Sequence, residues 1–326
     1  MSATTIALQV LVAATIGMLA AAAVAAAEPA YPNRPIRIVT PYAPGGSTTV
    51  TGRLMGEHFT SRWRQNVIVD NRGGGNTTIG TAIVAKSPAD GYTLLLTTTT
   101  HSILPNVMTT PYDPVRDFAP VTTLGIQPHV LVLHPSVPAG TVQELIALAK
   151  ANPDQLTFAS SSSGGTSHMA GEVFKMLTGV KMRHIPYKGG GPATIDLLGG
   201  HVQMFFSVSL NVVGHIQSGK LKALAVTGET RLTALPQTPT FAEVGVKGLD
   251  VKTWHGVFAP ADTSRMIVDK LSAEIGAWLA TASVQEKLEG LGLTTMISTP
   301  DQFGAMVKSE LGLYSKVVRA ANIRID

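Results

Sequence analysis

Short runs of β-branched and aliphatic residues alternate with helical patterns along the chain, and this alternation limits the fold more than any other feature. The first three runs are IRIV (36–39), VIVD (67–70) and TLLLTT (93–98), with helical periodicity between them. A second series of strand-like runs follows: VLVLHP (130–135), LTFAS (156–160), MRHIPY (182–187), VQMFFSV (202–208) and LKALAVT (221–227). Such alternation is typical of mostly parallel sheets flanked by helices. The sequence therefore predicts an α/β protein with two such units.

Capping signals mark the start of two predicted helices. Thr141 and Glu144 have the spacing of a capping box, in which each side chain accepts a hydrogen bond from the backbone amide of the other residue. Thr299 followed by Pro300 puts a capping hydroxyl and a proline at the first turn of a C-terminal helix. Further helices are expected over about 167–177 and 263–280.

The composition fits a folded protein with a large core. Of 326 residues, 44% are hydrophobic and 14% are charged, which argues against disorder. A chain of this size usually divides into two lobes of roughly 100–150 residues. The net charge of +4 comes from scattered lysines and arginines and only 6% of residues are aromatic, so nucleic acid is not expected as a partner. The absence of cysteine excludes disulfides and thiolate metal sites.

Residues 1–27 form a candidate signal peptide. Residues 2–27 carry no charged side chain, and the stretch 6–24 is apolar enough to enter a membrane. Ala25 and Ala27 offer small residues for cleavage before Glu28. A retained membrane anchor is the alternative, because the n-region lacks the Lys or Arg that signal peptides usually have. A misassigned start codon would explain this missing positive charge. Cleavage predicts a periplasmic protein, since the later apolar runs are only strand-length.

Four glycine-rich loops each leave a predicted strand and enter a predicted helix. They are PGGST (44–48), NRGGGNTTIG (71–80), SSSGGTSH (161–168) and KGGGPAT (188–194). Open α/β sheets bind ligands at this end of their strands, and a helix N-terminus offers free N–H groups to an anion. Because tight turns and caps use the same residues without a ligand, any one loop is weak evidence. Four loops in two units predict a cleft that binds one small carboxylate, since these loops contain almost no acidic side chain for a metal or an amine.

Motifs of known enzymes are mostly missing from the chain. It contains no G-x-S-x-G, H-E-x-x-H or G-x-x-x-x-G-K-[ST], and its histidines lack metal spacing, so neither catalysis nor a cofactor nor a metal is expected. His168 lies in the first turn of a predicted helix, which favours a neutral hydrogen-bonding role. A serine hydrolase using residues 161–163 with His168 is the enzyme alternative, although no acidic residue to orient the histidine is apparent nearby. Trp254 is expected to be structural rather than in contact with a ligand.

Six longer motifs carry a family resemblance. In chain order they are IRIVTPYAPGGSTT, VIVDNRGGG, SPADGYTLL, SSSSGGTSHMAGEVFKMLTG, HIPYKGGGPATIDLLGGHVQMFF and TWHGVFAP. From about Tyr31 to the C-terminus the sequence resembles the Bug family, the extracytoplasmic substrate-binding proteins of tripartite tricarboxylate transporters. The resemblance implies a two-lobed periplasmic-binding-protein fold, type II-like, that closes on a ligand held between the lobes.

The resemblance also implies ligand contacts from four loops. In the family, the loop after the first strand and the loop equivalent to 71–80 bind one carboxylate through main-chain N–H groups and bridging water. The corresponding first-lobe residues are Ala43, Gly45, Gly46, Ser47, Thr48, Thr49, Asn76, Thr77 and Thr78. The second lobe is expected to contribute Ser161, Ser163, Thr166, His168, Lys188, Gly189 and Gln203 at the far end of the ligand.

Three positions depart from the family pattern. Thr49 stands where many amino-acid-binding members have an aspartate, so a ligand ammonium would find no counter-charge. Asn76 and Thr77 replace a common second pair of glycines, where their side chains would narrow the pocket or add hydrogen bonds. Gln203 replaces a common aspartate, which again favours an anionic ligand. A dicarboxylate, tricarboxylate or aromatic acid is therefore expected rather than an amino acid.

The predicted protein is a monomeric receptor that delivers its carboxylate to the integral-membrane permease subunits of a tripartite tricarboxylate transporter. Residues 28–125 together with 246–326 are expected to form the first lobe, and residues 126–245 the second. A sensor that passes the same ligand signal to a histidine kinase is the alternative function.

Overall fold

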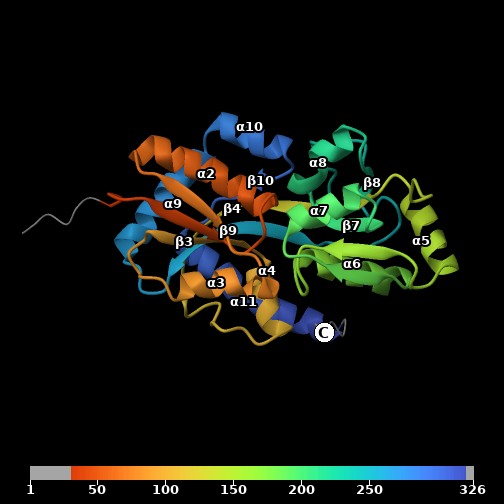
Figure 1. Cartoon of the computed structure of the whole chain (residues 1–326), viewed down its shortest axis with the longest axis horizontal. Helices are drawn as coiled ribbons and strands as arrows, with labels where there is room; N and C mark the ends of the chain where they lie inside the picture. The colour runs from red at the N-terminus through yellow and green to blue at the C-terminus, as the bar shows by residue number, and fades with distance from the viewer. Residues whose placement is uncertain (1–30, 321–326) are drawn as a thin grey trace, which may run out of the picture.

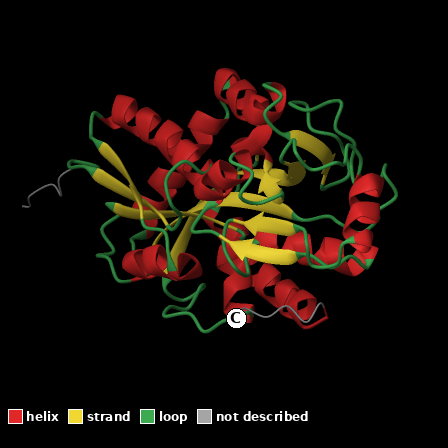
Figure 2. Cartoon of the chain, turned by 45° about the vertical axis from the view of Figure 1, so that its right-hand side comes forward, coloured by secondary structure: helices red, strands yellow, loops and turns green. Residues whose placement is uncertain are grey.

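The computed structural model describes residues 31–320, and the predicted signal peptide lies outside this range. Two α/β lobes lie side by side in Figure 1, with the first lobe at the left and the second at the right. Helices cover both faces of the strands (Figure 2). The predicted α/β fold with two lobes is confirmed. Within residues 31–320, no helix is both long and apolar enough to cross a membrane.

The first lobe is built on a sheet with the order β2-β1-β3-β9. Strands β1 (Ile36–Thr40), β2 (Val67–Asn71) and β3 (Thr93–Thr98) pair in parallel, and β9 (Lys252–Pro260) is antiparallel to β3. The accompanying helices are α2 (Ser47–Trp63), α3 (Thr78–Ala85), α4 (Thr100–Ile103), α9 (Arg265–Leu279), α10 (Ala282–Gly290) and α11 (Pro300–Ala320), with the 3-10 turns η1 (Gly75–Thr77) and η2 (Leu104–Asn106).

The second lobe has its own parallel strands. Strand β5 (Thr157–Ser160) pairs in parallel with β6 (Arg183–Pro186) and with β7 (Met204–Val208). Strand β8 (Lys222–Val226) lies off this row. The helices of this lobe are α5 (Val142–Ala151), α6 (Thr166–Thr178), α7 (Gly190–Leu198) and α8 (Ser209–Gln217).

Two long strands connect the lobes. In β4 (Phe118–Leu133), residues up to Pro128 pair with β9, whereas His129 onward pairs with β7 and β8. The short strand β10 (Thr294–Thr295) also pairs with β4, at Ile126 and Gly125. These connecting pairings are antiparallel, which the strand-helix alternation of the sequence does not indicate. The chain therefore crosses between lobes along β4 and returns along β9.

Local signals account for several helix boundaries. The capping box at Thr141 and Glu144 is present, with both reciprocal hydrogen bonds. At the start of α11, the amide of Gln302 donates to Oγ1 of Thr299 over 3.2 Å, and the amide of Thr299 donates to Oε1 of Gln302 over 2.9 Å. Each pair satisfies amides that the first helical turn leaves free, so these starts follow from sequence alone.

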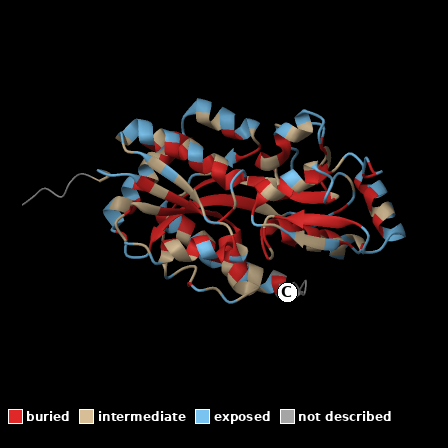
Figure 3. Cartoon of the chain, in the orientation of Figure 1, coloured by how far each residue is buried: buried red, intermediate tan, exposed pale blue. Residues whose placement is uncertain are grey.

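The strands form the buried centre of both lobes, and the outer helix faces are exposed (Figure 3). Trp254 on β9 is 2% exposed, and its Nε1 donates to Oε2 of Glu310 on α11 over 2.8 Å. A β-carbon at Gly256 would lie 2.2 Å from the ring of Phe303, so glycine lets α11 pack directly on the connecting strand. Trp254 is therefore a structural core residue, as predicted, and the structure places it on a strand that connects the lobes.

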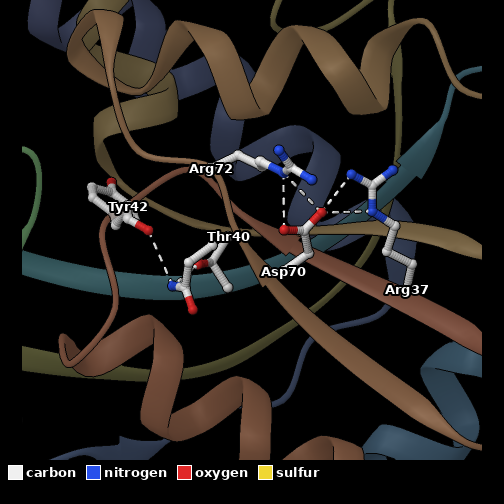
Figure 4. Close-up of polar contacts among 6 residues, drawn as sticks. Arg37, Thr40, Tyr42, Asp70 and Arg72 are labelled. Carbon is white, nitrogen blue, oxygen red and sulfur yellow. Dashed lines mark hydrogen bonds and ion pairs between the residues drawn. The ribbon is translucent and has the colours of Figure 1, made fainter.

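Polar contacts at the carboxyl end of β1 and β2 fix the loop that follows β1. Asp70 accepts hydrogen bonds from Nε of Arg37 at 2.9 Å and from Nε of Arg72 at 3.0 Å, and lies between the two guanidinium groups in Figure 4. Despite partial burial, these bonds lower the pKa of the Asp70 carboxyl. The next residue, Asn71, points its Nδ2 at the carbonyl oxygen of Tyr42 over 3.0 Å. Side-chain hydrogen bonds from β2 thus fix the position of the loop after β1.

Candidate ligand-binding site

A cavity lies where the loops of the two lobes meet, and hydroxyl groups dominate its wall. None of the residues that line it, in the described part of the chain, carries a charge. Eight of them have a hydroxyl group: Tyr42, Ser47, Thr48, Thr98, Ser161, Thr166, Ser167 and Thr253. The others are Gly46, Gly190, Phe205, Val208 and Asn211. The wall can therefore hydrogen-bond a polar ligand but offers no side-chain counter-ion.

Four helices begin at this cavity. Their N-cap residues are Gly46 for α2, Gly165 for α6, Gly189 for α7 and Val208 for α8. No capping side-chain hydrogen bond is found at any of these four positions, all within the described residues. The first amides of a helix have no partner within the helix, and each N-terminus carries a partial positive charge of about half a unit. The cavity is therefore electropositive without a charged side chain.

Hydroxyl groups form short chains in the wall. Tyr42 Oη and Thr98 Oγ1 are 2.7 Å apart, and Thr98 Oγ1 donates toward Thr100 Oγ1 over 3.3 Å. Burial raises the pKa of the Tyr42 phenol, so this group stays protonated and able to donate. On the opposite side, Oγ1 of Thr253 on β9 donates to Oγ1 of Thr166 on α6 over 2.7 Å. That bond leaves the proton of the Thr166 hydroxyl free to donate into the cavity.

Direct backbone contacts close the cleft beside the cavity. The amide of Ala43 donates to the carbonyl oxygen of Lys188 in the other lobe over 2.7 Å. A β-carbon at Gly191 would lie 2.3 Å from the carbonyl oxygen of Pro44. The cavity volume is about 30 Å³. One water molecule needs roughly 10–15 Å³, so the closed cavity is too small for an organic acid. An organic ligand can enter only when the lobes separate.

A buried polar network lies behind the cavity. His255 on β9 is fully buried, with Nε2 3.2 Å from Ser47 Oγ and Nδ1 3.1 Å from Thr51 Oγ1, both on α2. Gln127 on β4 contacts the same Nε2 over 2.7 Å, and its Oε1 accepts from the amide of Leu210 on α8 over 3.3 Å. The start of α2 is thus linked through both connecting strands to the start of α8.

The first predicted loop contributes three of its six candidates to the cavity. Gly46, Ser47 and Thr48 line it. Ala43 lies at the contact between the lobes, and Gly45 faces the backbone of Gly191 there. The sixth candidate, Thr49, is 1% exposed and its hydroxyl accepts from Asn71 Nδ2 over 2.8 Å. The Thr49 side chain therefore supports the loop from behind.

The second predicted loop lies next to the first rather than in the cavity wall. Asn76, Thr77 and Thr78 do not line the cavity, and Asn76 Nδ2 lies 3.9 Å from the sulfur of Met108. The glycines of this loop have packing roles. A β-carbon at Gly73 would lie 2.6 Å from the amide nitrogen of Ala43, and one at Gly80 would lie 2.7 Å from Cα of Pro41.

Ser161 and Thr166 are the second-lobe candidates that line the cavity. Gly189 is the N-cap of α7, directly before the lining residue Gly190. The carbonyl oxygen of Lys188 accepts the hydrogen bond from the amide of Ala43. Ser163 is not in the wall. Gln203 accepts hydrogen bonds from the amide (2.9 Å) and the hydroxyl of Thr157 at the start of β5, the strand end away from the cavity.

His168 is buried beneath the third loop. Its Nδ1 accepts from the amide of Gly164 over 3.0 Å, and its ring stacks on His184 with 3.8 Å between ring centres. Its Nε2 is 3.6 Å from Glu172. Although burial would raise the pKa of Glu172, hydrogen bonds from His168 and Lys175 lower it to about 2. His168 thus shapes the loop as a hydrogen-bond acceptor.

The serine and histidine groups of a hydrolase are not brought together. Ser161 Oγ contacts Ser167 Oγ over 3.1 Å, and no hydrogen bond joins His168 to residues 161–163 through a serine hydroxyl, within the described chain. The closest serine and histidine pair is Ser160 and His184 at 2.6 Å, but Ser160 is fully buried. Among residues 31–320, no group of three metal-ligating side chains is placed to hold an ion.

Eight residues of the wall were not among the sequence candidates. Two of them, Ser167 and Gly190, belong to predicted glycine loops, and Thr98 and Val208 each end a predicted strand, so the sequence could have indicated these four positions. Nothing in the local sequence marks the other four as ligand contacts: Tyr42, Phe205, Asn211 and Thr253. Of these, Thr253 reaches the cavity only because β9 returns between the lobes.

Two α/β lobes that close on an uncharged, electropositive cavity define a solute-binding protein of the periplasmic type. Residues 52–323 match the sequence model of the Tripartite tricarboxylate transporter family receptor, and the chain belongs to this family. The resemblance to Bug proteins is thereby confirmed. The family consists of periplasmic solute-binding receptors and not of enzymes.

Relatives and solved structures agree with this membership. Protein BugT of Bordetella pertussis is 38% identical over 321 residues, which cover 96% of this chain and 98% of BugT. An R. palustris protein solved with adipate is 33% identical with a TM-score of 0.87, covering 90% of this chain and 99% of that one. MatC from Rhodopseudomonas palustris with bound malate is 28% identical with a TM-score of 0.83, covering 88% of this chain and 100% of that one.

Proposed function

We propose that the protein captures a small organic carboxylate in the cavity between its lobes and delivers it to the permease subunits of a tripartite tricarboxylate transporter. The observation that carries the proposal is the convergence of four helix N-termini on a wall without charged side chains. Such amides favour an anion, and free amides and hydroxyls match the acceptor oxygens of a carboxylate. Relatives solved with adipate and malate support the same ligand class.

Each lobe has a role in this proposal. Gly46, Ser47 and Thr48 at the start of α2 bind one carboxylate through backbone amides and hydroxyls. Ser161 and Thr166 donate from the second lobe. An amino acid is a poor ligand, because its ammonium group would enter an electropositive cavity without a carboxylate to pair with. The proposed ligands are therefore acids without an amino group, including dicarboxylates, tricarboxylates and aromatic acids.

Delivery requires the lobes to separate, and the connecting strands are the natural hinge. We assign the lobe boundary to the point between Pro128 and His129, where the pairing of β4 changes from β9 to β7 and β8. The return lies near the start of β9 at Lys252. In the open form the ligand enters, and in the closed form the contact between Ala43 and Lys188 covers it.

Thermal melting with a panel of ligands tests the proposal, because a ligand that binds only the folded state raises the melting temperature. The protein is purified from the periplasm of an expression host, stripped of bound ligand by partial unfolding, and tested with mono-, di- and tricarboxylates, aromatic acids and amino acids. We expect a rise with one class of acid and none with amino acids. Gly46→Trp should abolish the rise, whereas Gly290→Ala, at the exposed end of α10 with open space around it, should retain it. A flat panel would overturn the carboxylate assignment.

A further inference from the structure

Asn211, a cavity-lining residue in the first turn of α8, carries an acceptor atom without a hydrogen-bond partner among the described residues. It lines the cavity from the second lobe, and its Oδ1 is buried without a hydrogen-bond partner among the described residues. A β-carbon at Gly190 would lie 2.2 Å from Nδ2 of Asn211, so the amide group packs against the α7 backbone and is held in place. A buried acceptor without a protein partner is costly unless a ligand, or a water molecule before the ligand binds, supplies the missing donor.

The orientation of the Asn211 amide follows from its neighbour. The hydroxyl of Ser207 donates to the carbonyl oxygen of Val208 over 3.1 Å, so its oxygen is available only as an acceptor for Asn211. Nδ2 of Asn211 lies 3.5 Å from that oxygen and is the donor toward it. Exchanging the two amide atoms would set two acceptors against each other. Oδ1 is therefore the atom left without a partner.

The surroundings of Asn211 limit which donor it accepts from. Phe205 and Val208, the other non-glycine residues of the wall without a hydroxyl, are apolar, and four helix N-termini make the cavity electropositive. An ammonium donor is disfavoured by that potential, and an ionised carboxylate has no proton to give. A neutral hydroxyl group fits both conditions. The hydroxyl groups of the wall can accept hydrogen bonds as well as donate them, whereas the amide oxygen of Asn211 can only accept.

We propose that the physiological ligand is a hydroxy acid whose hydroxyl group donates a hydrogen bond to Oδ1 of Asn211. The proposal rests on the proposed carboxylate-binding function and adds to it a specificity-determining residue. One end of the ligand, the carboxylate, is held at the start of α2, and the hydroxyl is read at the start of α8. An acid of the same shape without the hydroxyl would leave the buried oxygen unpaired.

Calorimetric titration of matched acids tests the proposal. The pairs are malate and succinate, 2-hydroxyglutarate and glutarate, lactate and propionate, and 3-hydroxybutyrate and butyrate. Wild type should bind at least one hydroxy acid roughly 10-fold or more tightly than its partner without the hydroxyl. Asn211→Leu keeps the side-chain volume but removes the acceptor, so it should reduce that ratio to about one while the affinity for the other acid is retained. Gln217→Leu, at the exposed end of α8, should keep the wild-type ratio.

The possible outcomes distinguish the role of Asn211 from carboxylate binding itself. Equal affinity for both acids of every pair, or an unchanged ratio in Asn211→Leu, would overturn the role of Asn211 and leave carboxylate binding intact. Absence of binding by every acid of these pairs and of the thermal-melting panel would overturn both. Because the ratio compares two ligands on one variant, a general loss of stability in Asn211→Leu cannot imitate the expected result. Asn211→Ala, which also lacks an acceptor, provides a second variant if Asn211→Leu does not fold.

Discussion

Gln127 donates a hydrogen bond from its Nε2 to Nε2 of His255 over 2.7 Å, joining the two strands that connect the lobes. The tautomer of His255 follows from this contact. Nε2 accepts from Gln127, while Thr51 gives its hydroxyl proton to the carbonyl oxygen of Ser47 over 3.1 Å and so accepts from Nδ1–H of His255. His255 is therefore neutral, protonated at Nδ1, and fully satisfied in that form.

Acid should destabilise the protein, in part through His255. Burial lowers the pKa of His255 to about 3 in the folded state, against 6.5 for an exposed histidine. The unfolded chain therefore binds a proton first, and stability falls as pH falls from 6.5 toward 3, by about 1.4 kcal/mol per pH unit at most for this residue. His255→Gln should reduce the dependence of the unfolding free energy on pH between 6 and 4, measured with urea.

The exposed His201 provides the matched control, because His201→Gln changes a histidine outside the core. It should leave the pH dependence as in wild type. An undiminished slope in His255→Gln would show that this histidine is not held neutral by the fold.

Closure depends on the absence of a side chain at Gly191. Its β-carbon would lie 2.3 Å from the carbonyl oxygen of Pro44 in the other lobe, although the helical backbone of α7 accepts alanine. Gly191→Ala should therefore hold the lobes apart and weaken ligand affinity by roughly 10-fold or more, since the closed form becomes less populated. Calorimetry gives the affinity, and small-angle scattering should show no compaction on adding the ligand.

Gly214→Ala tests whether helix propensity alone accounts for such an effect. Gly214 lies in α8 with open space around its Cα, so alanine should raise stability by up to about 1 kcal/mol and leave the affinity unchanged. Wild-type affinity and compaction in Gly191→Ala would contradict the contact between the lobes.

Replacing the carboxylate of Glu310 by the amide of glutamine should stabilise the folded protein at neutral pH. Burial raises the pKa of Glu310, and the hydrogen bond from Trp254 opposes this shift only in part. The folded state thus binds a proton on the Glu310 carboxyl more tightly than the unfolded chain does. The free energy of unfolding therefore falls as pH rises from 4.5 through the raised pKa. Glu310→Gln keeps an acceptor for Trp254 and should raise the melting temperature at pH 7 but not at pH 4. Glu289→Gln, outside the core, should have little effect at either pH, and a lower melting temperature of Glu310→Gln at pH 7 would contradict this account.

The parts of the fold that follow from local signals could be predicted from the sequence. The capping box at Thr141 and the proline start at Pro300 depend on residues within one helical turn, and the strands depend on short apolar runs. The antiparallel path of β4 and β9 depends on pairing between residues far apart, which periodicity does not contain. The same limit applies to the site. The start of α2 could be found, whereas Asn211 and Thr253 reach the cavity only through tertiary packing.

The two glycine loops of the first lobe should differ in their effect on binding. Thr48 lines the cavity, so Thr48→Val should weaken affinity roughly 10-fold through a lost hydrogen bond to a charged group. Asn76 lies outside the wall, beside Met108, so Asn76→Ala should change affinity less than about twofold. Both variants are titrated with the best acid of the panel, after matching melting temperatures without ligand. An equal loss in both would mean that Asn76 contacts the ligand in the bound form, as the family resemblance implies, and that the loop at 71–80 moves toward the cavity on binding, because Asn76 lies outside the wall here.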